Sequence, residues 1–317
     1  MTPAVKKRIE HLIRSTGWVP DPPSPGDFTA DHPEVVKLLV KTALGHRLRG
    51  RRLPGSTDLR PFCSPVQFQG HYNTCTAHVV TSMMALLENR AHGRYVPASR
   101  LFLYQVTKRI LGEAATDPGV YLRQMMGCVV LIGVPPETYF PYLDTTIDDD
   151  PRLAAEPDAF CFAIAHDLRA VRYVRLDPLG EAPATILERI RSFLATGFAA
   201  SIGFPLFRSA LERSLTHAEM PLPKPGEKAV GSHAVLLVGY DDQRKIAGTK
   251  PDGESATGAF LFKNSWDTKW GDQGYGWLPY RYLLDGLAHD VWTLIQAAWV
   301  DTQSFQIDWA TPTETSG

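Results

Sequence analysis

The chain has 317 residues, of which 44% are hydrophobic and 21% are charged, and its formal net charge is −1. This composition is typical of a globular protein with enough apolar material for one large domain or two lobes. The near-neutral charge gives no reason to expect nucleic acid or a membrane surface as a partner. No apolar run in the sequence approaches the roughly 18 residues that a membrane-spanning helix needs.

The N-terminus carries early positive charge, but the apolar core of a secretory signal does not follow it. We therefore expect a cytoplasmic protein, and secretion by a route without a signal stays open. None of the four cysteines forms a Cys-x-x-Cys pair or a Cys/His cluster with zinc spacing, so no metal site and no cofactor are expected. Cys128 and Cys161 are interpreted as buried apolar side chains, with a disulfide as the alternative.

The N-terminal part of the chain predicts two amphipathic helices and an extended connection. Residues 3–16 place apolar side chains on one helical face, and a second helix begins at Pro33 with Asp31 as its expected cap. The proline-rich stretch 20–27 connects the two helices. Four arginines follow within residues 45–55, which are interpreted as a solvated linker. A proteolytic processing site and a patch for an acidic partner are the alternatives for this basic stretch.

Helical spacing dominates the part of the chain that follows. Apolar residues recur at helical intervals over about 76–89, over 97–112 with Ser99 as a candidate cap, and from the turn at 117–119 to Val129. The first half of the chain is therefore predicted to be mostly helical.

The second half of the chain changes character. The stretch 169–176 alternates like a strand, and 184–196 is spaced like a helix. Turns rich in Gly, Pro and Asp then separate four apolar runs that predict strands: AASIGF, SHAVLLVGY, GAFLFKNSW and GYGWLPY. Helices followed by an antiparallel sheet favour an α+β fold in which two lobes enclose a cleft.

One thiol stands at a chemically distinctive place, in the stretch PVQFQGHYNTCTA at residues 65–77. Gln69 precedes Cys75 by six residues, and helical apolar spacing begins immediately after the cysteine. A thiol in the first turn of a helix ionises more readily, because the free backbone N–H groups and the helix dipole favour an anion. The side-chain amide of Gln69 is placed to help hold an oxyanion.

Acyl transfer by a thiol also needs a base and a group that orients the base. His233 opens the apolar run SHAVLLVGY and Asn264 ends the next run, so the two side chains meet if these strands pair. Trp266 and Trp270 follow, and an indole over the His–Asn hydrogen bond would shield it from water. From the residues alone, the alternatives are a structural histidine, a turn asparagine and two core tryptophans.

Taken together, these motifs resemble those of the papain-like cysteine peptidases. The matching stretches are PVQFQGHYNTCTA, SHAVLLVGY and KNSWDTKWGDQGYG, in the order that the family has them. The likeness extends from Asp58 to about Ile295. The loop PKPGEK at residues 223–228 is similar to a loop found in bacterial members of the family.

The resemblance implies an α+β, papain-like two-lobed fold. A helical lobe would span about 58–165 and an antiparallel, β-barrel-like lobe about 166–317, with the active-site cleft between them. Residues 1–57 would form an N-terminal extension that either covers the cleft and inhibits in cis or braces the back of the domain. The implied partner is a peptide or protein substrate, with no nucleic acid and no membrane.

For the catalytic residues, the resemblance implies that Cys75 is the nucleophile and His233 the general base and later acid. Asn264 would orient the imidazole ring. Gln69 and the backbone N–H of Cys75 would form the oxyanion hole.

Substrate binding is implied for Gly119, whose backbone would pair with an extended peptide, and for Trp266. Four positions depart from the family pattern and leave the side-chain preference of the cleft open: Tyr72, Thr76, Pro118 and Asp267. Tyr72 stands where the family usually has a disulfide-forming cysteine, which fits a reducing compartment.

The activity implied by the resemblance is hydrolysis of peptide bonds by a thiol endopeptidase or exopeptidase. One alternative uses the same acyl-enzyme but transfers the acyl group to an amine, as a transpeptidase or peptide ligase does. The other alternative is a non-catalytic binding module on the same fold.

Overall fold

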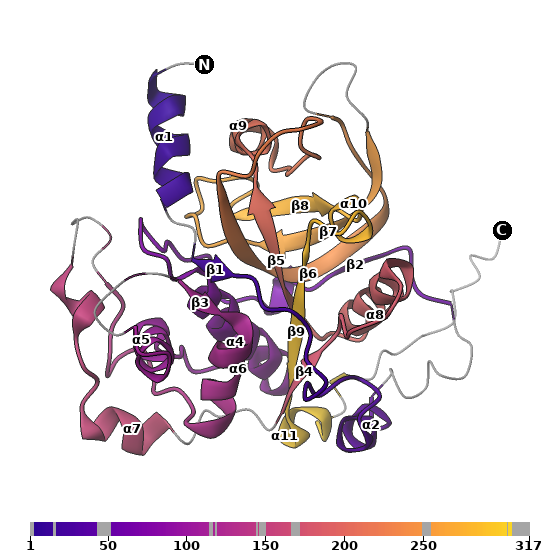
Figure 1. The fold of residues 1–317 in the computed structure, drawn as a ribbon. Coiled ribbons are helices and arrows are strands. Elements are labelled where there is room, and N and C mark those ends of the chain that lie inside the picture. The colour runs from indigo at the N-terminus through magenta and orange to yellow at the C-terminus, as the bar shows by residue number, and fades with distance from the viewer. Residues whose placement is uncertain are drawn as a thin grey trace.

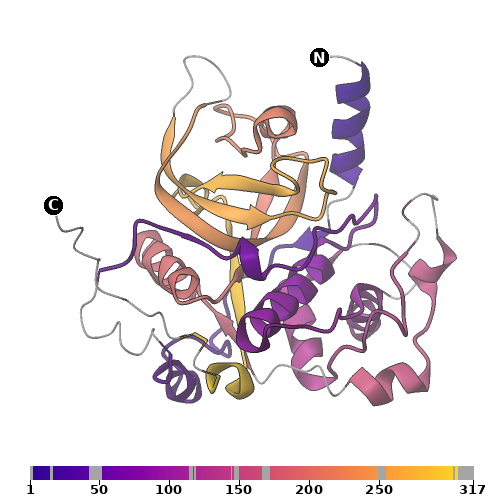
Figure 2. The ribbon, with the colours of Figure 1, turned by 180° about the vertical axis from the view of Figure 1, so that it is seen from behind.

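The computed structural model describes residues 3–14, 17–42, 52–113, 117, 119–143, 145, 150–165, 172–248, 255–302 and 304–305. Pro118 and most of the basic stretch lie outside these residues. None of the described helices is long and apolar enough to cross a membrane. A helical lobe and a sheet lobe lie side by side in Figure 1 and again in the reverse view of Figure 2, so the predicted α+β, two-lobed architecture is confirmed.

The N-terminal part forms helix α1 (Pro3–Arg14), strand β1 (Trp18–Val19) and helix α2 (Pro33–Leu39). Both predicted helices are present, but the prediction that Asp31 caps the second one is wrong. The imidazole Nδ1 of His32 accepts a hydrogen bond from the N–H of Glu34 at 3.3 Å instead. Because Pro33 takes the first helical position, the residue directly before it is the one in place to cap. We call residues 17–42 the N-terminal strap.

The helical lobe contains η1 (Arg60–Phe62), α4 (Cys75–His92), α5 (Arg100–Ile110), β3 (Val120–Tyr121), α6 (Leu122–Leu131), η2 (Pro151–Ala154) and α7 (Ala159–Ala165). Helix α4 ends at Gly93, whose left-handed φ of 68° suits a glycine C-cap. The predicted cap of α5 is confirmed, because the Ser99 hydroxyl accepts from the N–H of Phe102 at 3.1 Å. Helix α4 packs against α5 and α6 on one side and against β5 and β6 on the other, so its first half is fully buried.

The sheet lobe contains β2 (Ser56–Asp58), β4 (Arg172–Arg175), α8 (Pro183–Ala195), β5 (Ala200–Leu206), α9 (Arg208–His217), β6 (Gly231–Ile246), β7 (Ala256–Lys263), β8 (Tyr275–Pro279), α10 (Arg281–Leu284), β9 (His289–Ile295) and α11 (Ala297–Val300). The strand order is β4-β9-β5-β6-β7-β8, with β2 paired to β6, and neighbouring strands are antiparallel. Within the described residues the sheet ends at β4 and β8, so it is open and not a closed barrel. Strand β9 and helix α9 were not predicted from the sequence.

Two features of this fold position the site. Strands β6 and β7 pair with Leu236 opposite Lys263, so the start of β6 lies beside the residues that follow β7. Strand β1 pairs in parallel with β3, so the N-terminal strap runs between the two lobes before it reaches α2 (Figure 1).

Candidate active site

Cys75 is the first residue of α4, and its side chain is completely buried. Gln69 lies in the loop before it and is fixed from two directions. Its Nε2 donates to the Tyr72 carbonyl at 2.8 Å, and its Oε1 accepts from the Ser265 hydroxyl at 2.6 Å. Its backbone N–H donates to the Ser265 carbonyl at 2.9 Å. The loop that precedes the thiol is therefore tied to the residues that follow β7.

His233 on β6 and Asn264 after β7 meet as the strand pairing predicts. The His233 Nε2 lies 2.9 Å from Asn264 Oδ1, which also accepts from the N–H of Ser265 at 2.8 Å. Because Oδ1 can only accept, Nε2 carries the proton in neutral imidazole and Nδ1 has a free lone pair. The indole of Trp266 stacks on the imidazole at 4.4 Å, and Trp270 meets Trp266 edge-on at 5.4 Å. These two rings keep water away from the His–Asn hydrogen bond.

The N-terminal strap occupies the space beside these groups. The Gly17 carbonyl accepts from the N–H of Val120 at 2.9 Å, and Trp18 and Val19 continue the parallel pairing along β3. A Cβ on Gly119 would lie 2.3 Å from the Gly17 oxygen, and a Cβ on Gly17 would lie 1.9 Å from the Asn73 oxygen. Only glycine at both positions permits so close a backbone approach.

The side chain of Trp18 anchors the strap on the sheet lobe. Its indole Nε1 donates to Asp290 Oδ2 at 2.8 Å, and its carbonyl accepts from the Ser232 hydroxyl at 2.5 Å. The indole lies against Gly203, where a Cβ would come within 2.0 Å of the ring. The strap thus contacts both lobes, through β3 on the helical lobe and through β5, β6 and β9 on the sheet lobe.

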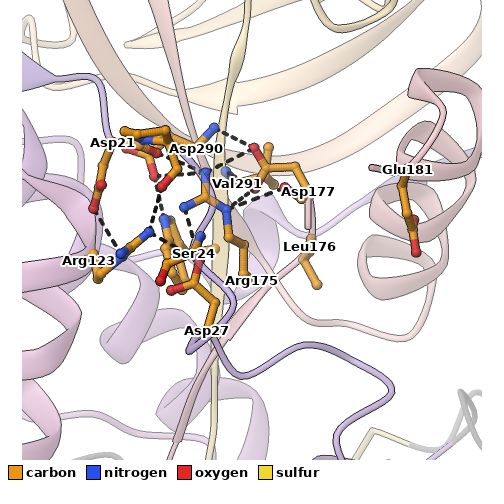
Figure 3. Close-up of polar contacts among 12 residues, drawn as sticks. Asp21, Ser24, Asp27, Arg123, Arg175, Leu176, Asp177, Glu181, Asp290 and Val291 are labelled. Atoms are coloured by element: carbon orange, nitrogen blue, oxygen red, sulfur yellow. Dashed lines mark hydrogen bonds and ion pairs between the residues drawn. The ribbon is translucent and has the colours of Figure 1, made fainter. Parts of the chain in front are cut away.

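A buried charge cluster fixes the next part of the strap (Figure 3). The Arg175 guanidinium donates to the Asp21 carbonyl at 3.0 Å and to Asp177 Oδ1 at 3.0 Å, and it lies 3.5 Å from Asp27 Oδ2. Arg123 on α6 contacts the same strap carboxylates, with Asp21 at 3.0 Å and Asp27 at 3.1 Å. Removing one partner of such a buried network typically destabilises it by about 3–5 kcal/mol.

Burial disfavours the charged forms of both the Cys75 thiol and the His233 imidazole. Desolvation raises the pKa of Cys75 to about 11, although hydrogen bonds from the Ala234 and Gly17 backbones act in the opposite direction. Desolvation also lowers the pKa of His233 to about 4, opposed by the hydrogen bond to Asn264. The Nδ1 of His233 has no hydrogen-bond partner among the described residues. In this covered state burial therefore opposes ionisation of the thiol, against the effect of the helix N-terminus that favours it.

Known proteins with the same architecture support an enzymatic identity. A model of the papain family cysteine proteases matches residues 222–283, which include His233 and Asn264. The chain is 28% identical over 295 residues to an uncharacterized peptidase C1-like protein of Acanthamoeba polyphaga mimivirus, covering 89% of this chain and 87% of that protein. It also resembles the solved structure of xylellain, a cysteine protease from Xylella fastidiosa, with a TM-score of 0.69 and 25% identity over 89% of this chain and 96% of that one. These matches make the chain similar to papain-like cysteine peptidases, in sequence over residues 222–283 and in fold over most of its length.

The fold of this chain is also shared with solved proforms at lower identity. The procathepsin B of Trypanosoma congolense matches with a TM-score of 0.63 and 17% identity, over 91% of this chain and 89% of that one. The procathepsin L2 of Tenebrio molitor matches with a TM-score of 0.60 and 20% identity, over 93% and 80% respectively.

The peptidase brings most of the predicted site residues together. Gln69 and Asn264 are linked through Ser265, and His233 bonds to Asn264 next to Ala234, whose backbone meets the Cys75 thiol. Gly119 and Trp266, which were assigned to substrate binding, lie against the strap and against His233 respectively. The described cysteines, including Cys128 and Cys161, are all free thiols.

The residues through which the strap covers the candidate site were not predicted from the sequence. Gly17, Trp18 and Asp290 were not singled out, and Ser265 was quoted only as part of a motif. A glycine followed by a tryptophan, directly before the proline-rich stretch, is the one sequence signal that marks the strap.

Proposed function

We propose that this peptidase hydrolyses peptide bonds through an acyl-enzyme on Cys75. The observation that carries the proposal is the His233–Asn264 hydrogen bond of 2.9 Å, which leaves the Nδ1 lone pair of the imidazole without a hydrogen-bond partner in the described part of the chain. The next residue, Ala234, hydrogen-bonds the Cys75 thiol through its backbone, so the base-bearing strand lies at the nucleophile. A thiol, a base and a group that orients the base are the parts that thiol acyl transfer needs.

In the proposed reaction His233 Nδ1 takes the proton from the Cys75 sulfur, and the thiolate attacks the carbonyl carbon of the substrate. The tetrahedral intermediate collapses when the C–N bond breaks and the imidazolium returns its proton to the leaving amine. Water, deprotonated by the same nitrogen, then attacks the thioester and releases the carboxylate and the thiol. Asn264 holds the ring in one orientation through both proton transfers.

Gln69 and the backbone N–H of Cys75 supply the oxyanion hole in this proposal. The carboxamide of Gln69 is held by Tyr72 and Ser265, so its second Nε2 hydrogen is fixed in direction without needing the substrate. Such preorganised donors stabilise the developing negative charge without reorganisation during the reaction.

The N-terminal strap is proposed to inhibit in cis. It occupies the edge of β3 with its own backbone and buries both Cys75 and His233. Release of the strap rehydrates these groups, removes the desolvation that keeps them neutral and makes the thiolate–imidazolium pair accessible. The likeness to two procathepsins, which are proforms by name, supports this part of the proposal. In this account residues 1–57 act as a covering segment.

Turnover of fluorogenic peptides by the full chain with Gly17→Ala, which is expected to displace the strap, tests the proposed function. Cys75→Ala is expected to lower kcat/KM at least about 10⁴-fold, because nothing else in the site can form the acyl-enzyme. Cys63→Ala is the matched control. Cys63 is the C-cap residue of η1, has a free thiol and takes no part in the proposed reaction. Cleavage that survives in Cys75→Ala would remove Cys75 from its proposed role.

A further inference from the structure

Lys263, the last residue of β7, is a buried cation and is 3% exposed. Its Nζ donates to the Ser64 hydroxyl at 2.8 Å and to the Ser82 hydroxyl at 3.1 Å. In the part of the chain that the structure describes, no carboxylate forms an ion pair with this ammonium group. Burial lowers the pKa of Lys263 to about 8, so most of the side chain is still charged at neutral pH. A buried charge without a counter-charge is costly, which favours the binding of an anion.

The two ionisable side chains that act on Lys263 do not supply this counter-charge. Burial raises the pKa of Cys63 to about 11, so its thiol is neutral at neutral pH. Arg100 is itself a cation, and its Nη2 pairs with Glu137 Oε1 at 2.7 Å. The positive charge of Lys263 is therefore not balanced within the described residues.

A cavity of about 200 Å³ is lined by the two hydroxyls that hold the ammonium group. Ser64 and Ser82 contribute to its polar end, and none of its lining residues belongs to the N-terminal strap. A second cavity, of about 10 Å³, is lined by Lys263 itself and shares Gln67 and Ser82 with the first. The other walls of the larger cavity are mainly apolar or aromatic and include Pro65, Ala85, Tyr95, Pro97 and Ala98.

The polar end of the larger cavity is rich in hydrogen-bond donors. The hydroxyls of Ser64 and Ser82 accept from Lys263, and neither hydroxyl hydrogen has an acceptor among the described residues. Lys263 has a third N–H hydrogen besides the two that it donates there. The Oε1 of Gln67 has no hydrogen-bond partner in the described part of the chain, so this carboxamide is free to present its NH₂ group instead. A carboxylate, which only accepts hydrogen bonds, matches this set of donors.

We propose that the larger cavity binds a small monocarboxylate with a short apolar tail. The carboxylate oxygens accept from the hydroxyls of Ser64 and Ser82 and balance the charge of Lys263, while the tail lies against the apolar walls. A dianion such as phosphate fits less well, because one lysine balances one negative charge and the second would stay buried without a partner. This site goes beyond the proposed function, since none of the residues that line the larger cavity has a role in the proposed reaction.

Binding of benzoate and benzamide to the full wild-type chain, measured by calorimetry, tests the proposal. The two molecules have nearly the same shape, but only benzoate is charged. Benzoate is expected to bind at least about tenfold more tightly, the value of one hydrogen bond to a charged group. Chloride and phosphate are expected to bind more weakly than benzoate, because neither fills the apolar part of the cavity. Equal affinities for benzoate and benzamide would overturn the proposal, and tighter binding of chloride or phosphate would overturn the carboxylate and its tail as the ligand class.

Two variants place the bound carboxylate at Lys263. Lys263→Met is expected to remove the preference for benzoate, because the cation is lost and the apolar stem is kept. Ala85→Glu introduces a carboxylate into the cavity from α4, one turn after Ser82, and is expected to abolish benzoate binding and to raise the melting temperature. Lys245→Met is the matched control, since Lys245 is exposed on β6.

A second route covers poor folding of the lysine variant. Ser82→Ala then replaces Lys263→Met and is expected to weaken benzoate binding several-fold through loss of one donor. Benzoate binding that persists unchanged in Ala85→Glu, or in the variant used at Lys263 or Ser82, would overturn the inference. These readouts measure binding and stability alone, so they are independent of whether Cys75 catalyses cleavage.

Discussion

The carbonyl oxygen of Gly17 accepts a hydrogen bond from the backbone N–H of Val120 at 2.9 Å. This bond begins the parallel pairing of β1 with β3, next to Gly119, where the resemblance implies that an extended substrate would pair. In the proposed function the strap therefore lies where a substrate backbone would bind. In the proposed function, release of the strap controls access to Cys75.

Gly17→Ala is predicted to open the site. The new Cβ would lie 1.9 Å from the Asn73 carbonyl oxygen, so the strap has to leave its place beside Cys75. The rate of Cys75 alkylation at neutral pH is expected to rise at least about tenfold, because the thiol becomes solvated and can pair with His233. Gly55→Ala is the control, since a Cβ there meets nothing within 4 Å. Equal alkylation rates in the two variants would show that the strap does not protect the thiol.

Asp27→Asn is predicted to loosen the strap through the charge cluster. The substitution removes the ion pairs that Asp27 makes with Arg123 at 3.1 Å and Arg175 at 3.5 Å, and Arg175 is completely buried. Basal turnover of a fluorogenic peptide is expected to rise several-fold while the fold is retained. Asp31→Asn is the matched control, because Asp31 is 83% exposed and its one ion pair, with Arg189, spans 4.0 Å. An increase of the same size in both variants would exclude the buried cluster as the cause.

Gln69→Ala is predicted to lower kcat/KM by about 10²-fold through loss of the oxyanion donor. The fold is expected to survive at a lower melting temperature, because the Tyr72 carbonyl and the Ser265 hydroxyl each lose a buried partner. Ser265→Ala breaks one of these bonds and keeps the donor, so its effect on kcat/KM should be much smaller. If Ser265→Ala and Gln69→Ala lowered the rate equally, Gln69 would act only by holding the loop in place.

The stability of the closed state, in which the strap covers the site, is predicted to depend on pH through the ionisation of Asp290. Burial raises the pKa of this carboxyl from 3.8 to about 6 in the closed state. Release of the strap is expected to hydrate this carboxyl and to bring its pKa back toward 3.8, against the smaller effect of losing the Trp18 hydrogen bond, which lowers the pKa. The contribution of Asp290 to closure is then expected to be greatest below about pH 4 and to be lost as the pH rises through 6. Burial raises the pKa of Asp21 and Asp177 in the same cluster, whereas burial lowers the pKa of His289 and works in the opposite sense.

Comparison with Asp290→Asn isolates this one group from the others. Asparagine cannot ionise, so the strap of the variant should gain protection relative to the wild type as the pH rises through the window. Hydrogen exchange at the Val120 amide, which bonds to Gly17, reports the closed population after correction for the intrinsic pH dependence. Parallel profiles for the two proteins across this window would mean that Asp290 does not couple the strap to pH.

The three motifs made the arrangement of the candidate site predictable. His233 and Asn264 stand at the ends of two apolar runs that are consecutive strands in the sheet, and consecutive strands usually pair. Cys75 was placed correctly because the helical pattern begins directly after it. These patterns are local, so they can be recognised in the sequence without knowledge of the rest of the fold.

The covering of the site was not predictable in the same way. Strands β1 and β3 have two residues each and lie about a hundred residues apart, so neither shows a periodic pattern. The role of Asp290 depends on a bulge between β5 and β9, and β9 itself was missed because a short apolar run does not distinguish a strand from a buried helix. The contact of Gly17 with Cys75 is a tertiary feature, and burial of the thiol opposes the ionisation that the helix N-terminus favours.

The most direct test of the account is the rate of Cys75 alkylation against pH, measured by mass spectrometry in the wild type and in Gly17→Ala. We predict that the alkylation rate of wild-type Cys75 stays low at neutral pH and rises only as the pH approaches the thiol pKa of about 11. In Gly17→Ala we predict fast labelling well below about pH 8, as expected for a thiolate paired with an imidazolium. If both proteins labelled only near the ordinary thiol pKa of about 8.5, the site would hold no activated thiolate and the peptidase mechanism proposed for Cys75 would be contradicted.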